Sequence, residues 1–125
     1  MKEGLREINE LTGIWGGLVC NNQGEIIQSN TPPGLDVSSL ENINRDLISM
    51  FSSAAESMQG ISEIVLHYEQ RKLLVLDLEN AFLIVICTPS VDLSILRMTV
   101  NVVLTTWESN RKVQKLLKDS FVERI

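Results

Sequence analysis

The segment GIWGGLVCNNQGEIIQSN, residues 13–30, decides the fold, and the proline-rich loop TPPGLD, residues 31–36, follows it directly. Residues 14–21 are mostly apolar, which is typical of a strand covered on both faces. A turn falls on residues 22–24, where the final glycine tolerates a positive φ angle. Residues 25–30 return as a short strand whose polar end suits an outer position. The segment therefore predicts a tight β-hairpin.

Helices are expected on both sides of this hairpin. Residues 2–11 carry Leu5, Ile8 and Leu11 at a helical spacing of three, so they predict a short amphipathic helix. The glycine pair at 16–17 weakens a strand, and it is plausible where a helix packs very close to the sheet.

A longer helix is predicted after the proline loop, as far as about Gln59, with Gly60 as the residue that follows its end. Its possible N-caps are Asp36, Ser38 and Ser39, and Ser38 with Glu41 fits a capping box. Its apolar side chains are Val37, Leu40, Ile43, Leu47, Ile48, Met50, Phe51, Ala54, Ala55 and Met58. This apolar face is wider than one sheet requires, so we predict that the helix also contacts a second copy of the chain.

Three further strands are predicted at residues 63–69, 72–78 and 81–87, joined by short turns into an antiparallel meander. The third run contains no polar residue, so it is expected to be the most central strand, covered by helices on both faces. A long final helix then begins at Ser90 or Asp92. Its expected packing stripe is Leu93, Leu96, Val100, Leu104 and Trp107.

The end of the chain has a different charge from the rest. Residues 108–125 contain five basic and three acidic residues, which gives a net charge of +2 against −7 for the remainder. Apolar and basic residues alternate there, so we predict a basic amphipathic helix beyond a domain formed by residues 1–107. This helix has three possible roles: a solvated extension, a helix that docks in the groove of a partner, or a helix that lies on a membrane surface. Packing on a partner or within a dimer is favoured, because anionic lipid would repel the acidic body.

The overall composition excludes several classes of protein. A net charge of −5 argues against a nucleic-acid partner, which calls for a basic patch. No segment approaches the roughly 20 apolar residues that span a bilayer, so no integral membrane segment is expected. The first 11 residues lack the apolar stretch of a secretory signal, so a cytoplasmic location is expected. The chain also lacks a phosphate-binding P-loop motif.

Few residues are candidates for catalysis. Cys20 and Cys87 lie in apolar strand patterns without metal-ligand spacing, so they are expected to be buried thiols. His67 is a possible general base, but a strand-surface histidine is the favoured interpretation. Asp77 is expected on an accessible part of the sheet. We therefore predict no catalytic residue, no metal site and no cofactor, which means that the protein is not an enzyme.

Two motifs resemble a known family. The segment LTGIWGGLV, residues 11–19, resembles the opening of the Roadblock/dynein-light-chain domain, and NQGEII, residues 22–27, resembles its hairpin. The apolar strand at residues 82–87 before a long final helix also matches. The resemblance covers about residues 3–107, and because its motifs are structural they specify the fold better than the activity.

The resemblance implies an α+β sandwich with the order αββαβββα. A five-stranded antiparallel sheet would carry the middle helix on one face and the terminal helices on the other. It also implies homodimers in which the strand at residues 63–69 pairs with its copy to give a continuous ten-stranded sheet. Such pairing would protect an edge strand that is otherwise prone to aggregate. The expected dimer interface is Ile48, Phe51, Ser52, Ala55, Ile64, Val65 and Leu66.

The resemblance further implies a non-catalytic regulator or scaffold of a small Ras-like GTPase, of the GTPase-activating type. It would bind across the switch regions and favour their catalytic arrangement. The expected partner-binding residues on the middle helix are Arg45, Ser49, Ser53 and Glu56. For Arg45 alone, an ordinary solvated helix arginine is the favoured interpretation. The alternative function is a structural adaptor, similar to a light chain, for a sensor kinase or a motor complex, with no effect on GTP hydrolysis.

Overall fold

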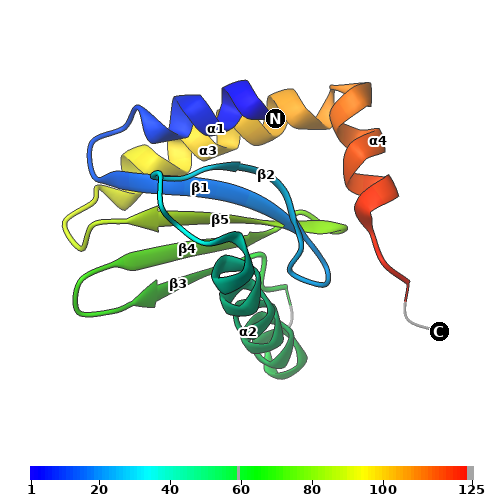
Figure 1. Cartoon of the computed structure of the whole chain (residues 1–125), viewed down its shortest axis with the longest axis horizontal. Helices are drawn as coiled ribbons and strands as arrows, with labels where there is room; N and C mark the ends of the chain where they lie inside the picture. The colour runs from blue at the N-terminus through cyan, green and yellow to red at the C-terminus, as the bar shows by residue number, and fades with distance from the viewer. Residues whose placement is uncertain (59, 124–125) are drawn as a thin grey trace.

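The computed structural model describes residues 1–58 and 60–123 as one five-stranded sheet with helices on both faces (Figure 1). The elements are α1 (Lys2–Asn9), β1 (Ile14–Asn21), β2 (Ile26–Asn30), α2 (Val37–Ser57), β3 (Glu63–His67), β4 (Lys72–Asp77), β5 (Ala81–Cys87), α3 (Leu93–Glu108) and α4 (Arg111–Ser120). The strand order is β2-β1-β5-β4-β3, and all neighbours are antiparallel. The prediction that the all-apolar strand β5 is central is confirmed.

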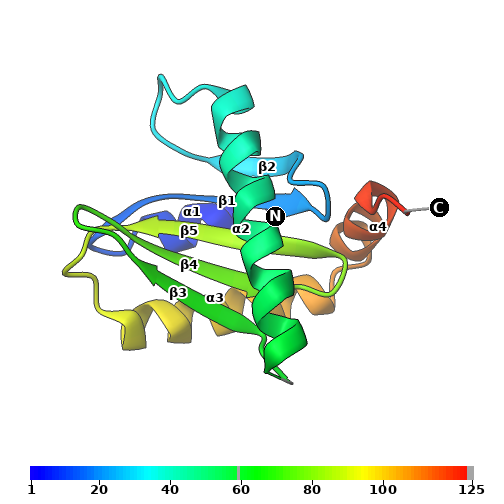
Figure 2. The ribbon, with the colours of Figure 1, turned by 90° about the horizontal axis from the view of Figure 1, so that it is seen from below.

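The helices divide between the faces of the sheet as expected. Figures 1 and 2 show α1 and α3 on one face and α2 crossing the other. Because successive strand residues point to opposite faces, β1 gives Leu18 and Cys20 to the core under α2, and Val19 to the core under α1 and α3. The α+β fold with two helices opposite one helix is therefore confirmed.

Close helix packing explains one of the glycines. A Cβ atom on Gly4 of α1 would lie 2.6 Å from Val103 Cγ1 and 2.8 Å from Trp107 Nε1 of α3. A Cβ atom on Gly17 would lie 3.4 Å from Leu5 Cδ2, which is an ordinary van der Waals distance, so α1 lies over this glycine without requiring it. Gly16 instead faces the backbone at the end of β2, where a Cβ atom would lie 3.1 Å from Asn30 O.

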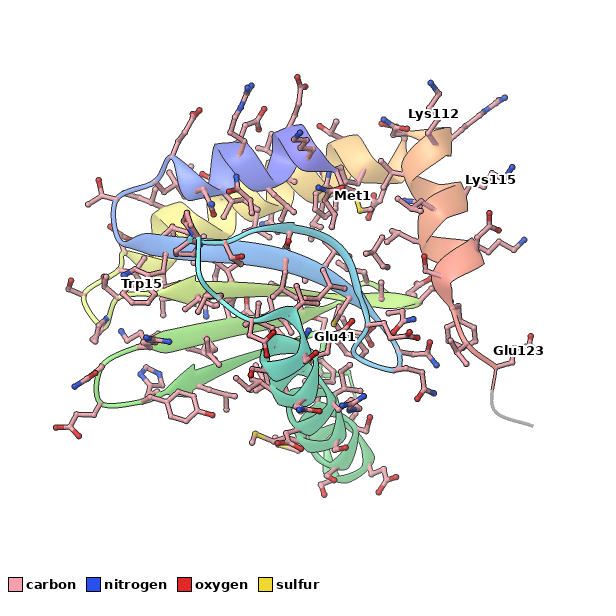
Figure 3. The ribbon with its side chains drawn as sticks, viewed as in Figure 1. Met1, Trp15, Glu41, Lys112, Lys115 and Glu123 are labelled. Carbon is pink, nitrogen blue, oxygen red and sulfur yellow. The ribbon has the colours of Figure 1, made fainter. Side chains whose placement is uncertain are left out.

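The start of α2 differs from the predicted capping box. The N-cap is Asp36, whose carboxylate accepts hydrogen bonds from Ser39 N at 3.2 Å and Ser39 Oγ at 3.0 Å. Glu41 does not return to the cap, because its carboxylate accepts from Ile26 N of β2 at 2.9 Å (Figure 3). Asp36, one of the three possible caps, is therefore the cap, and the Ser38–Glu41 capping box is wrong. Because the helix begins at Val37, Glu41 lies in its second turn and faces the hairpin.

The end of α2 also comes earlier than expected. The helix ends at Ser57, and Met58 is an extended C-cap with φ −134°. Gln59, the expected last residue, lies outside the described residues. Gly60 is in the left-handed region, with φ 80°, but it does not directly follow the cap.

The chain after α3 turns back toward the sheet. Asp92, one of the two expected caps, is the N-cap of α3. Asn110 is the N-cap of a separate helix, α4. Val113 and Leu117 of α4 are buried in the same core as Val103 and Trp107 of α3. Asn21 Nδ2 donates to Ser120 O at 3.0 Å and fixes the end of α4 to the hairpin. The domain boundary between residues 107 and 108 stays a prediction.

Candidate interaction site on the α2 face

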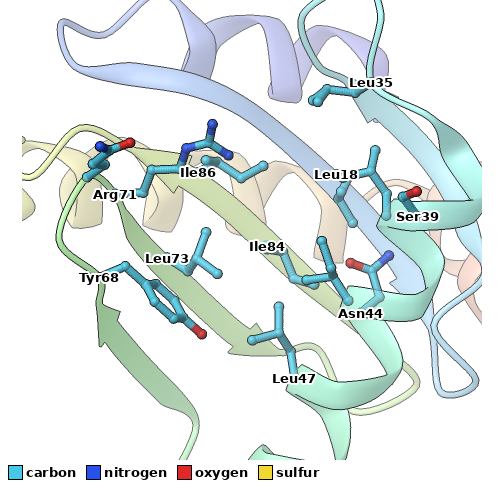
Figure 4. Close-up of a pocket in the computed structure, with 13 residues that line it drawn as sticks. Leu18, Leu35, Ser39, Asn44, Leu47, Tyr68, Arg71, Leu73, Ile84 and Ile86 are labelled. Atoms are coloured by element: carbon cyan, nitrogen blue, oxygen red, sulfur yellow. The ribbon is translucent and has the colours of Figure 1, made fainter.

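An apolar groove of about 440 Å³ lies between α2 and the part of the sheet that it leaves uncovered (Figure 4). It runs along the first half of the helix, over β1, β5 and the start of β4. Its lining residues are Leu18, Leu35, Ser39, Leu40, Ile43, Asn44, Leu47, Tyr68, Gln70, Arg71, Leu73, Ile84 and Ile86. This volume and apolar lining are typical of a binding site.

The helical side of the groove is positioned by the hairpin. Leu40, Asn44 and Leu47 repeat at spacings of four and three, so they share the inward face of α2. Asn44 is buried, and its Nδ2 donates to Gly24 O in the hairpin turn at 3.1 Å. Gly24 has φ 83°, and a Cβ atom there would lie 3.0 Å from Arg45 N. The turn therefore lies directly against α2 and fixes the height of the helix above the sheet.

Cationic and aromatic side chains lie at the open end of the groove. The guanidinium carbon of Arg71 is 4.3 Å from the ring centroid of Trp15, in cation–π contact. Arg71 and Tyr68 both line the groove, and all three side chains are exposed. Sequence reasoning missed this group, because its members come from the start of β1 and the β3–β4 turn. Only the antiparallel pairing of β1 and β4 with β5 brings them to the same end of the sheet.

The expected interface residues on α2 occupy different environments. Phe51 is only 3% exposed and packs edge-on against Phe82, with ring centroids 5.5 Å apart. Ile48 is half-buried, whereas Ser52 and Ala55 are exposed. The exposed large apolar side chains beside the groove are instead Ile43 and Met50, which share a face at a spacing of seven. The predicted interface stays a prediction, and Ile43 and Met50 are exposed apolar residues that it did not include.

Strand β3 supplies the remaining expected interface residues at the edge of the sheet. Ile64, Val65 and Leu66 are half-buried, and β4 is the only neighbour of β3 within the described part of the chain. Tyr68 N donates to Arg71 O, and Asp77 N donates to Ser62 O. In this antiparallel register the N–H of Val65 points away from β4, toward the free edge.

The expected partner-binding residues lie on the outer face of α2. Arg45, Ser49, Ser53 and Glu56 are all exposed, and their spacings of four, four and three place them along one side of the helix. The guanidinium of Arg45 donates to Asn42 Oδ1. The four side chains therefore form a polar strip that is open to a partner, and their role stays a prediction.

The candidate chemical residues are placed as follows. Burial raises the pKa of the Cys20 thiol to about 12 and that of Cys87 to about 11, so both are protonated at neutral pH and the expected burial is confirmed. His67 is exposed at the end of β3. Asp77 is exposed and accepts a hydrogen bond from Glu79 N at 2.7 Å, as expected for an accessible residue.

Metal-binding clusters and membrane-spanning helices are both absent from residues 1–58 and 60–123. These residues contain no group of three or more His, Cys, Asp or Glu side chains arranged to hold a metal ion. None of their helices has the length and apolar character needed to cross a bilayer.

Comparison with known proteins identifies the fold. No family model and no curated protein matches the sequence. Among solved structures, a Roadblock/LC7 domain from Streptomyces avermitilis has a TM-score of 0.72 at 13% identity, covering 86% of this chain and 94% of its own. The gliding protein MglB from Thermus thermophilus has a TM-score of 0.70 at 14% identity, covering 94% and 87%. MglB in a tetrameric arrangement has a TM-score of 0.71 at 15% identity, covering 94% and 88%. These identities establish the architecture alone, and the chain therefore has the Roadblock/LC7 fold that residues 11–27 resemble.

Proposed function

We propose that the protein is a homodimeric, non-catalytic regulator of a small Ras-like GTPase. The observation that carries the proposal is the combination, on this fold, of a free β3 edge with an exposed apolar flank of α2 beside a groove. The resemblance to the Roadblock/dynein-light-chain family implies the GTPase partner. The similar structure of MglB, a gliding protein also solved in a tetrameric arrangement, supports self-association.

In the proposed dimer, β3 pairs with its copy to give a ten-stranded sheet, and α2 of the partner covers the apolar flank. Pairing satisfies the outward N–H and carbonyl groups of the edge, including those of Val65. Complete burial of a side chain such as Met50 contributes roughly 1.5–3 kcal/mol. Ile43 and the groove add further apolar area, so self-association covers this exposed apolar surface.

The dimer places two α2 helices side by side, each with its polar strip outward. Arg45, Ser49, Ser53 and Glu56 of both copies then form a platform for the GTPase. The platform acts by binding the catalytic arrangement of the switch regions more tightly than other arrangements, and this difference in affinity shifts their populations. It supplies no catalytic side chain in this mechanism.

The dimer is tested by changing the free edge of β3. The substitution Val65→Pro removes the outward N–H without removing a β3–β4 hydrogen bond, and proline is tolerated on edge strands. Sedimentation equilibrium should show a dimer for the native chain and a folded monomer for the variant. The matched control Val65→Ala keeps the N–H and should remain dimeric. A native chain that is monomeric at micromolar concentration would contradict the proposal.

The regulatory role is tested with small Ras-like GTPases of the same organism. GTP hydrolysis should accelerate when the protein is added, and Arg45→Glu should weaken the effect. Stable complex formation with unchanged hydrolysis would instead support the alternative function, a structural adaptor. The absence of both binding and acceleration would contradict the GTPase proposal and leave the dimer test unaffected.

A further inference from the structure

A second exposed apolar surface lies on α3, on the opposite face of the sheet from α2. Ile95, Met98 and Val102 are 51%, 70% and 63% exposed, and their spacings of three and four place them in one strip on the helix. The proposed dimer and GTPase sites both use α2 and β3. This α3 strip is therefore separate from them and has no role in the proposed function.

Acidic side chains border the strip where α1 packs against α3. A hollow of about 370 Å³ at one end is lined by Glu10, Asp92 and Ile95, among others. A hollow of about 240 Å³ farther along α3 is lined by Glu3 and Glu7 together with Val103 and Thr106, which follow the strip on the helix. We call this surface, formed by the α3 strip and these four carboxylates, the acidic crease.

The positive groups of α1 are distributed unequally around the crease. Lys2 and the amino-terminal residue Met1 line the second hollow together with Glu3 and Glu7. Arg6 lines a different hollow, which it shares with Lys2, Glu3 and two residues of β2, Ser29 and Asn30. The crease is therefore most acidic at the end formed by Glu10 and Asp92, where no basic residue lines the hollow.

Helix α4 presents the complementary chemistry. Arg111, Lys112, Lys115 and Lys118 are exposed, and Asp119 is the one acidic residue within the helix. Figure 3 shows Lys112 and Lys115 directed away from the rest of the molecule. Two exposed apolar side chains, Leu116 and Phe121, accompany these cations. The helix therefore carries a basic outer face with apolar residues beside it.

Neither surface has an ion pair within its own chain, among the residues that the structure describes. Across residues 1–58 and 60–123, the ion pair between Arg97 and Glu63 is the single salt bridge. Helix α4 cannot fold back onto its own crease, because Val113 and Leu117 are buried in the core. The segment after it is also fixed, since Asn22 Nδ2 donates to Val122 O at 2.6 Å and Val122 N donates to Asn22 Oδ1 at 2.8 Å.

We propose that the basic outer face of α4 docks in the acidic crease of a second copy of the chain. Lysines of α4 meet the carboxylates of the crease, while Leu116 and Phe121 cover the α3 strip. Exposed ion pairs are individually weak and are screened by salt, so the contact is weak and sensitive to ionic strength. The two surfaces differ, so the contact is heterologous and joins chains, or dimers, into larger assemblies.

The test is sedimentation velocity of the full chain at about 20 mM and about 500 mM NaCl, which changes the screening length severalfold. The average mass should exceed that of a dimer at low salt and fall at high salt. The exposed charge reversals Lys112→Glu with Lys115→Glu, or Glu7→Lys with Glu10→Lys, should each weaken the low-salt association at least about tenfold. Mixing the two variants should restore it, because acidic helices then meet basic creases.

A matched control separates this contact from a general effect of net charge. Glu69→Lys with Glu79→Lys changes the charge by the same amount as the crease variant, but at exposed turn positions that line neither hollow of the crease. This control should keep the salt-sensitive association. Circular dichroism verifies that each variant is folded. Association that is absent at low salt, or that mixing folded variants does not restore, would overturn the inference.

The readout also distinguishes this inference from the proposed dimer. Val65→Pro should remove the association that persists at high salt, whereas the charge reversals should leave it unchanged. Failure of the β3 dimer would reduce the high-salt species to a monomer without affecting the salt-sensitive step.

Discussion

The two faces of the sheet receive similar apolar side chains but very different cover. Under α1 and α3, together with α4, fifteen residues form one buried cluster. Under α2, the buried hydrophobic cluster among the described residues has six members, and a groove remains open. Strand alternation supplies apolar residues to both faces, so the difference comes from the number of helices available. The face with a single helix therefore leaves more apolar surface for a second molecule to cover.

The largest expected effect concerns the well-covered face. Trp107 of α3 is buried in the same cluster as residues of α1 and α4. Trp107→Ala should therefore lower the free energy of unfolding by about 3–5 kcal/mol. Trp15, on the open face, is exposed, and Trp15→Ala should change it by less than about 1 kcal/mol. Urea denaturation measures both. Equal decreases in the free energy of unfolding for the two variants would contradict the difference in burial between the two faces.

The second prediction concerns the neighbouring leucines of α4. Leu117 is buried in the larger core, so Leu117→Ala should cost about 2–3 kcal/mol. Leu116 is exposed, and Leu116→Ala should cost about 0.5 kcal/mol or less. Thermal and urea unfolding of the two variants compare them directly. If both substitutions are neutral, residues 108–125 are a separable extension, as the sequence pattern predicts.

A third pair of variants compares the exposed methionines of the two faces. Met50→Lys places a charge in the proposed dimer contact and should raise the dimer dissociation constant at least about tenfold, which is about 1.4 kcal/mol. Met98→Lys on α3 should leave the high-salt dimer unchanged. Sedimentation equilibrium at high salt gives both constants. A dimer that tolerates Met50→Lys but not Met98→Lys would place the dimer contact on α3 instead of α2.

The smallest effect concerns the two buried thiols, one in each core. Their pKa values in the folded chain, about 12 for Cys20 and about 11 for Cys87, exceed the value of 9.0 for a free thiol. The unfolded chain therefore loses these protons first, and their contribution to stability is complete below pH 9 and declines as the pH rises toward 11–12. Deprotonation of each thiol in the unfolded chain should lower the free energy of unfolding by about 1 kcal/mol between pH 9 and pH 10.

Urea midpoints across this pH range, for the native chain and for Cys20→Ala and Cys87→Ala, measure the decline. Each variant should show a flatter pH dependence than the native chain. A dependence that is unchanged in Cys20→Ala would mean that the core under α2 is wetter than its burial indicates.

Much of the fold could be predicted from local pattern. The strands at 14–21 and 81–87 match the expected bounds, because turn residues and charged residues mark both ends of each apolar run. The cap of α2 could not be chosen in the same way, since Asp36, Ser38 and Ser39 all satisfy the local rule. The choice depends on the hairpin, which uses Glu41 to bind Ile26 N.

The site was less predictable than the fold. Helical periodicity showed that the apolar face of α2 is wider than packing on one sheet requires. It did not show which side of that face the sheet covers. That depends on the angle at which α2 crosses the strands. Val103 and Leu104 of α3 show the same limit, because both fit an apolar stripe and only Val103 is fully buried. The Trp15–Arg71 contact joins segments distant in sequence, so no local signal could predict it.

The β1–β2 hairpin tip is attached to two other parts of the molecule at once. On one side Asn22 binds the backbone of Val122, and on the other Gly24 O accepts from Asn44 of α2. A molecule that pulls on the C-terminal segment therefore transmits strain to the first turns of α2 through the short turn between Asn22 and Gly24. We expect Asn22→Ala to speed amide hydrogen exchange at both places together, and acceleration in the tail alone would show that they are mechanically independent.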